Sequence, residues 1–260
     1  MSATVVNHVV EGPGDAPAVV LINSLGADLS MWDPQANALR SAFRVVRFDA
    51  RGHGASPVPP PPYAVADLGE DVLVLLDRLE IERAAMCGVS LGGATAIWLA
   101  LNAPDRVSRL AVCFSAAYFG APEGWLQRAA TVRARGMTAV VDSVLERWFT
   151  PAFAGREPQV VERARTMLAA TPAEGYAAGC EAVAGIDLRA ELPRIEAPTL
   201  VLSGDQDPAT PPARGRQIAA RVPGAAFAEI PAAHLGNLEQ AELVNSLLFA
   251  HCRGLQGEGN

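Results

Sequence analysis

The chain has 260 residues, of which 50% are hydrophobic and 19% charged, and its formal net charge is -7. This composition excludes a disordered chain, and the length suits one large α/β domain with an insertion. A net negative charge repels phosphate backbones, so nucleic acid is excluded as an expected partner.

Strands and helices alternate along the first half of the chain. Apolar runs typical of strands buried on both faces are followed by runs with apolar residues at helical spacing. The expected strands are residues 4–10, 18–24, 43–51, 84–89 and 107–115, and the helical segments are 28–42 in part, 66–81 and 91–104. Such alternation predicts parallel strands joined by right-handed crossovers.

The alternation stops between residues 121 and 191. Only helix-like segments occur there, at 124–136, 137–149, 158–171 and 173–185, before strands 198–204 and 225–231 return with helices 211–222 and 238–252. We therefore predict an α/β fold with a mostly parallel central sheet and helices on both faces. Its core domain is residues 1–120 and 192–260. Residues 121–191 form an all-helical lid over the carboxyl edge of the sheet, where such sheets bind ligands.

A serine stands between two glycines where an expected strand meets an expected helix. The stretch Gly88-Val89-Ser90-Leu91-Gly92 would hold the Ser90 hydroxyl on a sharp turn above the sheet, with small neighbours relieving the crowding. The pattern Gly-x-Ser-x-Gly is common by chance, but its strand–turn–helix context makes it specific. Ser90 is the predicted nucleophile.

A serine hydroxyl needs a base to accept its proton, and the chain offers four histidines. His234 follows the last expected strand and precedes the last helix, so it should lie at the carboxyl edge and is the predicted base. His53 lies in a turn after a strand, where a loop-packing role is favoured. His8 and His251 are interpreted as structural or solvated.

The imidazole in turn needs a carboxylate that fixes its tautomer and stabilises its cation. Asp205 and Asp207 both follow the strand at 198–204. Asp207 lies further beyond the strand end and is the predicted acid, whereas Asp205 is expected to shape the turn. The chain order Ser90, Asp207, His234 is the order that this architecture uses.

Two backbone amides are expected to stabilise a tetrahedral oxyanion. The first is Leu91 N–H at the start of the helix, and the second is Leu25 N–H in the loop after the strand at 18–24. Losing one such donor typically slows a reaction by ~10²–10³-fold.

The cysteines Cys87, Cys113, Cys180 and Cys252 have no spacing typical of metal ligands and are interpreted as reduced structural thiols. No secretory signal and no apolar run of membrane-spanning length is visible, so a cytoplasmic protein without membrane contacts is expected. The sequence does not indicate an oligomeric state.

Several segments together are similar to those of a known family. They are NSLGADLSMWD, FRVVRFDARGHGAS, GVSLGG, ERWFTPAF, GYAAGCEAVAGIDLR, PTLVLSGDQDPATPP and PAAHLGNLE. The chain resembles the α/β-hydrolase superfamily and, within it, the 3-oxoadipate enol-lactonases. The resemblance implies the α/β-hydrolase fold and hydrolysis of the enol-lactone of 3-oxoadipate in aromatic degradation. It also implies an acyl-enzyme on Ser90 and no metal or organic cofactor.

The segment Cys113–Phe119 departs from that family's pattern. Phe114 and Tyr118 stand where the family usually has an asparagine and a basic residue, which predicts a more apolar pocket and bears on the substrate more than on the chemistry. For a substrate carboxylate, Arg133 is the first choice among the lid arginines, which also include Arg128, Arg135 and Arg147. Trp125 and Trp148 are expected in the pocket wall or the lid core.

Other functions remain compatible with these residues. A carboxylesterase, a thioesterase, a lactonase of another substrate or a C–C hydrolase would use the same three groups. A haloperoxidase-like activity usually has a proline near the oxyanion loop, and NSLGADLS has none. A small-molecule receptor on the hydrolase fold would bind tightly and turn over almost nothing.

Overall fold

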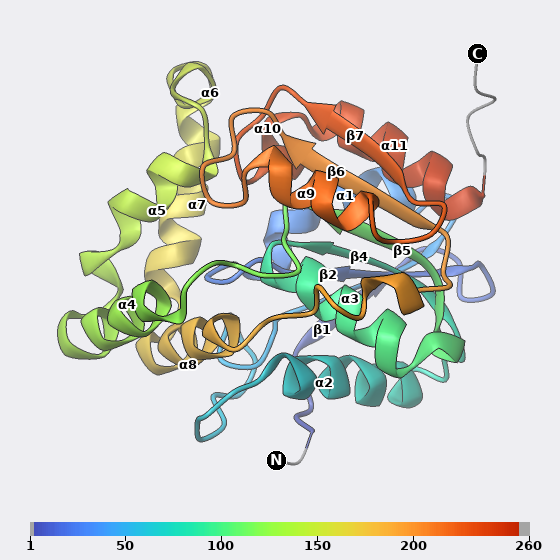
Figure 1. The fold of residues 1–260 in the computed structure, drawn as a ribbon, viewed down its shortest axis with the longest axis horizontal. Coiled ribbons are helices and arrows are strands. Elements are labelled where there is room, and N and C mark those ends of the chain that lie inside the picture. The colour runs from blue at the N-terminus through green and yellow to red at the C-terminus, as the bar shows by residue number, and fades with distance from the viewer. Residues whose placement is uncertain (1–2, 255–260) are drawn as a thin grey trace.

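A seven-stranded sheet runs through the centre of the computed structural model, which describes residues 3–254 (Figure 1). The strand order is β1-β3-β2-β4-β5-β6-β7, with β1 antiparallel to β3 and all other pairs parallel. The strands are β1 (His8–Glu11), β2 (Ala18–Ile22), β3 (Arg44–Phe48), β4 (Ala84–Val89), β5 (Val107–Cys113), β6 (Thr199–Gly204) and β7 (Ala226–Ile230).

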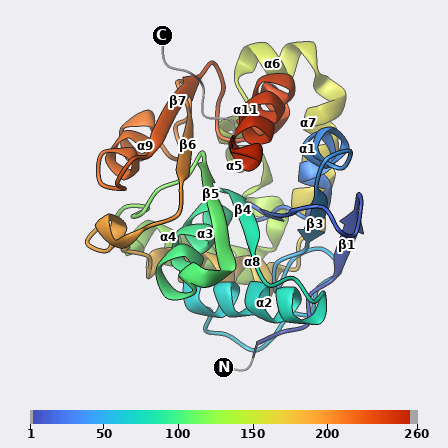
Figure 2. The same cartoon turned by 90° about the vertical axis from the view of Figure 1, so that its right-hand side faces the viewer.

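Helices cover the sheet on both faces, which explains why its central strands are apolar along their whole length. Every residue of β4 and β6 is buried, whereas the edge strand β1 is half exposed. Helices α1 (Asp33–Leu39) and α11 (Ala241–Arg253) pack against each other, as do α2 (Val65–Arg78) and α3 (Leu91–Asn102), and the two pairs lie on opposite sides of the sheet (Figure 2). Helices α9 (Pro212–Ala219) and α10 (Gly236–Glu239) follow β6 and β7.

Five helices occupy the chain between β5 and β6. They are α4 (Pro122–Arg135), α5 (Val141–Trp148), α6 (Pro151–Arg156), α7 (Pro158–Ala170) and α8 (Ala173–Ala184), and they lie together beside the sheet, coloured green to yellow in Figure 1. The predicted fold class is confirmed. The division into a core and a lid at residues 121–191 stays a prediction, and residues 1–2 and 255–260 of that core lie outside the described part of the chain.

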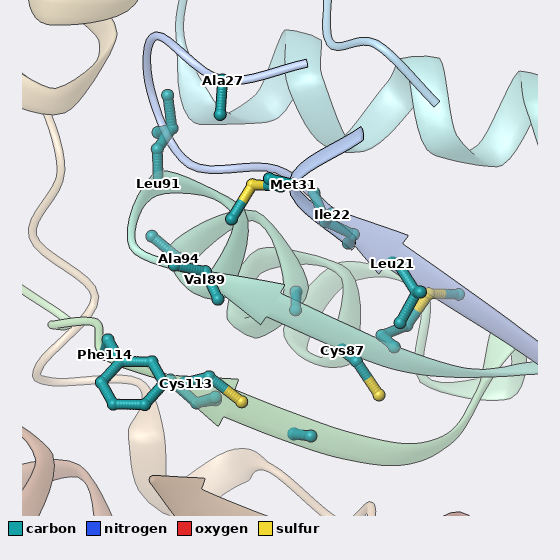
Figure 3. Close-up of a cluster of buried hydrophobic side chains, with 14 of the residues drawn as sticks. Leu21, Ile22, Ala27, Met31, Cys87, Val89, Leu91, Ala94, Cys113 and Phe114 are labelled. Carbon is teal, nitrogen blue, oxygen red and sulfur yellow. The ribbon is translucent and has the colours of Figure 1, made fainter. Parts of the chain in front are cut away.

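The hydrophobic core extends from the sheet to the turn that carries Ser90. Figure 3 shows Cys87 and Val89 of β4 and Leu91 after the turn, within one buried cluster that also holds Ala27 and Met31 of the loop after β2. Because these residues are close-packed, the turn after β4 and the loop after β2 have fixed positions relative to each other. Among residues 3–254, no helix combines the length and the apolar character that crossing a bilayer requires.

A half-buried histidine in α11 makes the stability of the fold depend on pH. Burial, together with Arg109, lowers the pKa of His251 to about 4, and its Nε2 lies 3.0 Å from the carbonyl oxygen of Leu110. The unfolded chain, with a histidine pKa near 6.5, therefore binds more protons than the folded chain between about pH 6.5 and 4, so stability falls as the pH falls through this range.

We expect His251→Gln to remove this dependence, because the amide can still donate to Leu110 but does not titrate. Between pH 7 and 4.5 the free energy of unfolding of the wild type should fall by about 2 kcal/mol more than that of the variant. Urea unfolding at the two pH values measures the difference. An equal fall in the free energy of unfolding of both proteins between the two pH values would contradict a lowered pKa of His251.

Candidate active site

Ser90 occupies a strained turn between β4 and α3. Its backbone has φ 57° and ψ -119°, outside the usual conformations of a residue with a side chain. A side chain at Gly88 would collide with the backbone of Gly92, and one at Gly92 would collide with the end of β2. Ser90 N–H donates to the carbonyl of Cys113 over 3.1 Å, and Ser115 Oγ donates to the Ser90 carbonyl over 2.6 Å. The glycines and these hydrogen bonds hold the turn in place.

His234 and Asp207 form a hydrogen-bonded pair at the carboxyl ends of β7 and β6. His234 Nδ1 lies 2.8 Å from Asp207 Oδ2, and both side chains are almost fully buried. The Asp207 carboxylate also accepts hydrogen bonds from the amides of Ala209 (2.8 Å) and Thr210 (2.9 Å) and from Thr210 Oγ1 (2.7 Å). Asp205, the other aspartate considered, is exposed, and its side chain accepts from the adjacent Gln206.

The pKa of Asp207 reflects two opposing effects. Burial would raise it, but the charge and hydrogen bond of His234 and the hydrogen bonds from Thr210 outweigh burial, so the pKa lies below its ordinary value. Asp207 is therefore ionised at neutral pH. A carboxylate at Nδ1 fixes the tautomer in which His234 Nε2 is free to accept a proton.

Ser90 and His234 line the same cavity, which has a volume of about 300 Å³. Leu25, from the loop after β2, lines it as well. Within residues 3–254, neither Leu25 N–H nor Leu91 N–H donates any of the observed hydrogen bonds, whereas the flanking amides of Ser24 and Gly26 donate to Met31 Sδ and His53 Nε2. Both amides therefore lack a hydrogen-bond partner among the described residues, but only Leu25 lines this cavity, and the oxyanion hole stays a prediction.

The loop that carries His234 is joined to the end of α5 by backbone hydrogen bonds. His234 N–H donates to the carbonyl of Arg147 (3.3 Å), and Leu235 N–H donates to that of Trp148 (2.9 Å). The buried Glu239 carboxylate accepts from Thr150, which follows α5, and from the amide of Ala233 (3.1 Å). The position of the imidazole therefore depends on α5 as well as on β7.

Two arginines supply positive charge to the cavity. Arg128 of α4 and Arg147 of α5 line it, no Asp or Glu of the described chain does, and neither arginine forms a salt bridge within residues 3–254. The guanidinium of Arg128 lies 4.7 Å from the ring centroid of Trp125. Burial and the neighbouring Arg128 lower the pKa of Arg147, while burial raises the pKa of Tyr176, another wall residue, to about 12. Two arginines that have no carboxylate partner among the described residues and line the same cavity as Ser90 favour an anionic ligand.

The structure places Arg133 outside this cavity. Its guanidinium forms salt bridges with Glu174 (2.7 Å) and Glu181 of α8, and these partners raise its pKa. Of the lid arginines considered from the sequence, Arg128 and Arg147 line the cavity and Arg133 does not. One feature of the sequence could have indicated that Arg128 lines the cavity. Arg128 follows Trp125 by three residues, so both side chains lie on the same face of the helix.

The other predicted contacts are divided between the cavity and its surroundings. Trp125 and Trp148 line the cavity. Phe114 is fully buried, with its ring against Gly236, and Tyr118 packs its ring under the guanidinium of Arg189 at 4.1 Å, so neither contributes to the wall. Phe119, the next residue, lines the wall instead.

All four cysteines are free, and three are buried. Cys87 Sγ and Cys252 Sγ lie 3.9 Å apart. Among the described residues, no group of three His, Cys, Asp or Glu side chains is arranged to hold a metal ion.

The fold and the placement of Ser90 at a strand–turn–helix junction are those of the α/β hydrolases. The α/β hydrolase fold family matches residues 17–241, and the chain belongs to it. It is 41% identical to 3-oxoadipate enol-lactonase 2 of Acinetobacter baylyi, over 94% of this chain and 91% of that protein. The resemblance predicted from the sequence is confirmed.

Two solved structures extend the comparison. The enol-lactonase of Burkholderia xenovorans LB400 superposes with a TM-score of 0.92 at 46% identity, covering 94% of each chain. A thermophilic esterase of Thermogutta terrifontis, solved with malate bound, superposes with a TM-score of 0.92 at 28% identity, covering 96% of this chain and 93% of that one.

Proposed function

We propose that this ester or lactone hydrolase opens the ring of a small lactone that carries a free carboxylate, with the enol-lactone of 3-oxoadipate as the best candidate. The observation that carries the proposal is the cavity in which Ser90 and His234 lie with Arg128 and Arg147. The similarity to enol-lactonases supports the same substrate. An esterase of similar fold, solved with malate bound, supports a ligand that carries a carboxylate.

In the proposed reaction, Ser90 Oγ attacks the lactone carbonyl while His234 Nε2 accepts its proton. Asp207 stabilises the resulting imidazolium, and the amides of Leu25 and Leu91 stabilise the oxyanion. The carbonyl–oxygen bond of the ring then breaks. An enolate leaves, takes the proton from His234 and becomes a ketone. A water molecule activated by His234 next releases the acid from Ser90. The overall reaction consumes one water molecule. With the enol-lactone of 3-oxoadipate as substrate, the enzyme would act in the degradation of aromatic compounds.

A substrate panel tests this function. Turnover of the enol-lactone, a simple neutral lactone and a p-nitrophenyl ester should all be measurable, with the highest kcat/KM for the enol-lactone. A higher kcat/KM for the neutral ester would point to a carboxylesterase, and ligand binding without turnover would point to a receptor on the hydrolase fold.

The arginines should determine the preference for an anionic substrate. In Arg147→Met or Arg128→Met, kcat/KM for the carboxylate-bearing lactone should fall by about 10- to 100-fold, mostly through KM, because a hydrogen-bonded charge contributes about 1.5–3 kcal/mol. Turnover of the uncharged p-nitrophenyl ester should stay near that of the wild type. Steady-state kinetics with both substrates give kcat and KM for each, and so show whether the loss is confined to the charged substrate.

Arg133→Met is the matched control, because Arg133 lies in the same helix as Arg128 but pairs with Glu174 and Glu181. We expect it to keep the wild-type preference for the charged lactone. An effect of Arg133→Met on the charged substrate alone would restore Arg133 as the carboxylate ligand and contradict the assignment to Arg128 and Arg147.

A further inference from the structure

The amide that follows Leu25 is bound by a buried histidine. Gly26 N–H donates to His53 Nε2 over 2.9 Å, and His53 lies in the turn after β3 with 2% of its surface exposed. His53 lines no part of the cavity and does not contact Ser90 or His234 through any observed hydrogen bond of residues 3–254. Any effect of His53 on the reaction must therefore act through the loop after β2.

The tautomer of His53 follows from its second contact. His53 Nδ1 lies 3.1 Å from the carbonyl oxygen of Arg51, which can only accept, so Nδ1 carries the hydrogen and Nε2 offers a lone pair to Gly26 N–H. Burial lowers the pKa of His53 despite the opposing effects of the Arg51 carbonyl and of Asp49 and Asp28. His53 is thus a neutral acceptor at physiological pH.

The backbone that orients His53 is anchored by a buried ion pair. Arg51 Nε and Nη2 donate to the two carboxylate oxygens of Asp71, each over 2.6 Å, and Nη2 also donates to the carbonyl of Asp67 over 3.0 Å. The charged pair keeps Arg51 in one position, because moving either partner would leave a buried charge uncompensated. The acceptor presented to Gly26 is correspondingly rigid.

The carbonyl group of Gly26 accepts a hydrogen bond from a residue between two of the inserted helices. Thr171 Oγ1, between α7 and α8, lies 3.2 Å from the Gly26 carbonyl oxygen. Gly26 has φ +82°, and a side chain there would come within 2.6 Å of Leu168 and 2.9 Å of the Tyr176 ring. The turn at Leu25 and Gly26 is therefore fixed on both sides.

We propose that His53 is a positioning residue of the oxyanion hole. By accepting the Gly26 N–H it fixes the peptide next to Leu25 and so directs the Leu25 N–H into the cavity, and Thr171 supports the same turn from the opposite side. This inference rests on the proposed function, because it requires Leu25 N–H to be an oxyanion donor.

The test compares His53→Leu, which removes the acceptor, with His53→Gln, whose amide oxygen can replace Nε2. With a p-nitrophenyl ester, His53→Leu should lower kcat by roughly 10- to 100-fold with little change in KM, less than the ~10²–10³-fold cost of deleting a donor. His53→Gln should recover most of the loss. Thr171→Val should show a smaller decrease in kcat, again with KM preserved.

A second measurement separates positioning from general damage. A phenylboronic acid adds to the serine as a tetrahedral anion, so its inhibition constant should rise with the loss in kcat/KM along the series. The affinity for adipate, which cannot form such an adduct, should stay unchanged. His251→Gln changes a half-buried histidine that does not line the cavity, and as the control it should behave as the wild type.

Each outcome has one interpretation. A folded His53→Leu with wild-type kcat, or a parallel loss of adipate and boronate binding, would overturn the role of His53. If His53→Leu does not fold, an unchanged kcat in Thr171→Val together with a parallel loss of adipate and boronate binding in His53→Gln would do so. Wild-type turnover that survives Ser90→Ala would instead refute the proposed function itself.

Discussion

Ser90→Ala is expected to lower the turnover of lactones and esters by a factor on the order of 10⁶, the usual cost of removing the nucleophile of a serine hydrolase. The variant lacks the oxygen that would form the acyl-enzyme, while His234, Asp207 and the cavity remain. Its fold should be preserved, because Ser90 Oγ makes no observed hydrogen bond in residues 3–254 and alanine fits the same turn. Steady-state kinetics and thermal unfolding measure the two effects.

A covalent label distinguishes a missing nucleophile from a disturbed site. An alkyl fluorophosphonate should attach one alkylphosphonyl group to the wild type, seen as a mass increase of the peptide that contains Ser90. The same peptide of Ser90→Ala should show no increase. Ser203→Ala is the matched control, since Ser203 is a buried serine of β6 that packs against Gly215 away from the cavity. Labelling at another serine, or comparable turnover in Ser90→Ala, would reject the proposed nucleophile.

Asp207→Asn is expected to lower kcat by about 10⁴-fold. Asparagine nearly matches aspartate in size, so the hydrogen bonds from Ala209 and Thr210 can persist. A neutral amide, however, stabilises neither the required tautomer of His234 nor its cation. KM should change little, because Asp207 contacts the imidazole and does not line the cavity.

Asp205→Asn provides the internal comparison for this variant. Asp205 lies two residues earlier, is exposed, and has its only observed side-chain hydrogen bond in the described chain with Gln206. We expect Asp205→Asn to retain wild-type kcat. The assignment of the acid would have to be reversed if Asp205→Asn lost activity while Asp207→Asn kept it.

The sequence predicted well those features that depend on local pattern and strand order. The fold class follows from the alternation of strands and helices. Residues just beyond parallel strands meet at one edge of the sheet, so their positions in the chain were enough to bring Asp207 and His234 together. The strained turn at Ser90 was also predictable, because small residues at 88 and 92 are required where the backbone of the helix approaches the strands.

Contacts between inserted helices were beyond sequence reasoning. Whether an arginine of α4 faces the cavity or α8 depends on how α4 is rotated against its neighbours. Arg133 pairs with Glu174 and Glu181, which are seven residues apart on α8, and that pairing is visible only when the two helices are docked. Phe114 and Tyr118 differ from the prediction for a related reason. Phe114 has φ 47°, and the chain leaves β5 in a direction that buries its ring beside Gly236.

The backbone pairing of α5 with the loop after β7 links the position of His234 to that of the cavity wall. Because His234 and Leu235 donate to the carbonyls at the end of α5, swinging that helix outward would displace the proton acceptor together with the cavity wall. Proton transfer and the shape of the cavity are therefore coupled through α5, which contributes Val144, Arg147 and Trp148 to the wall.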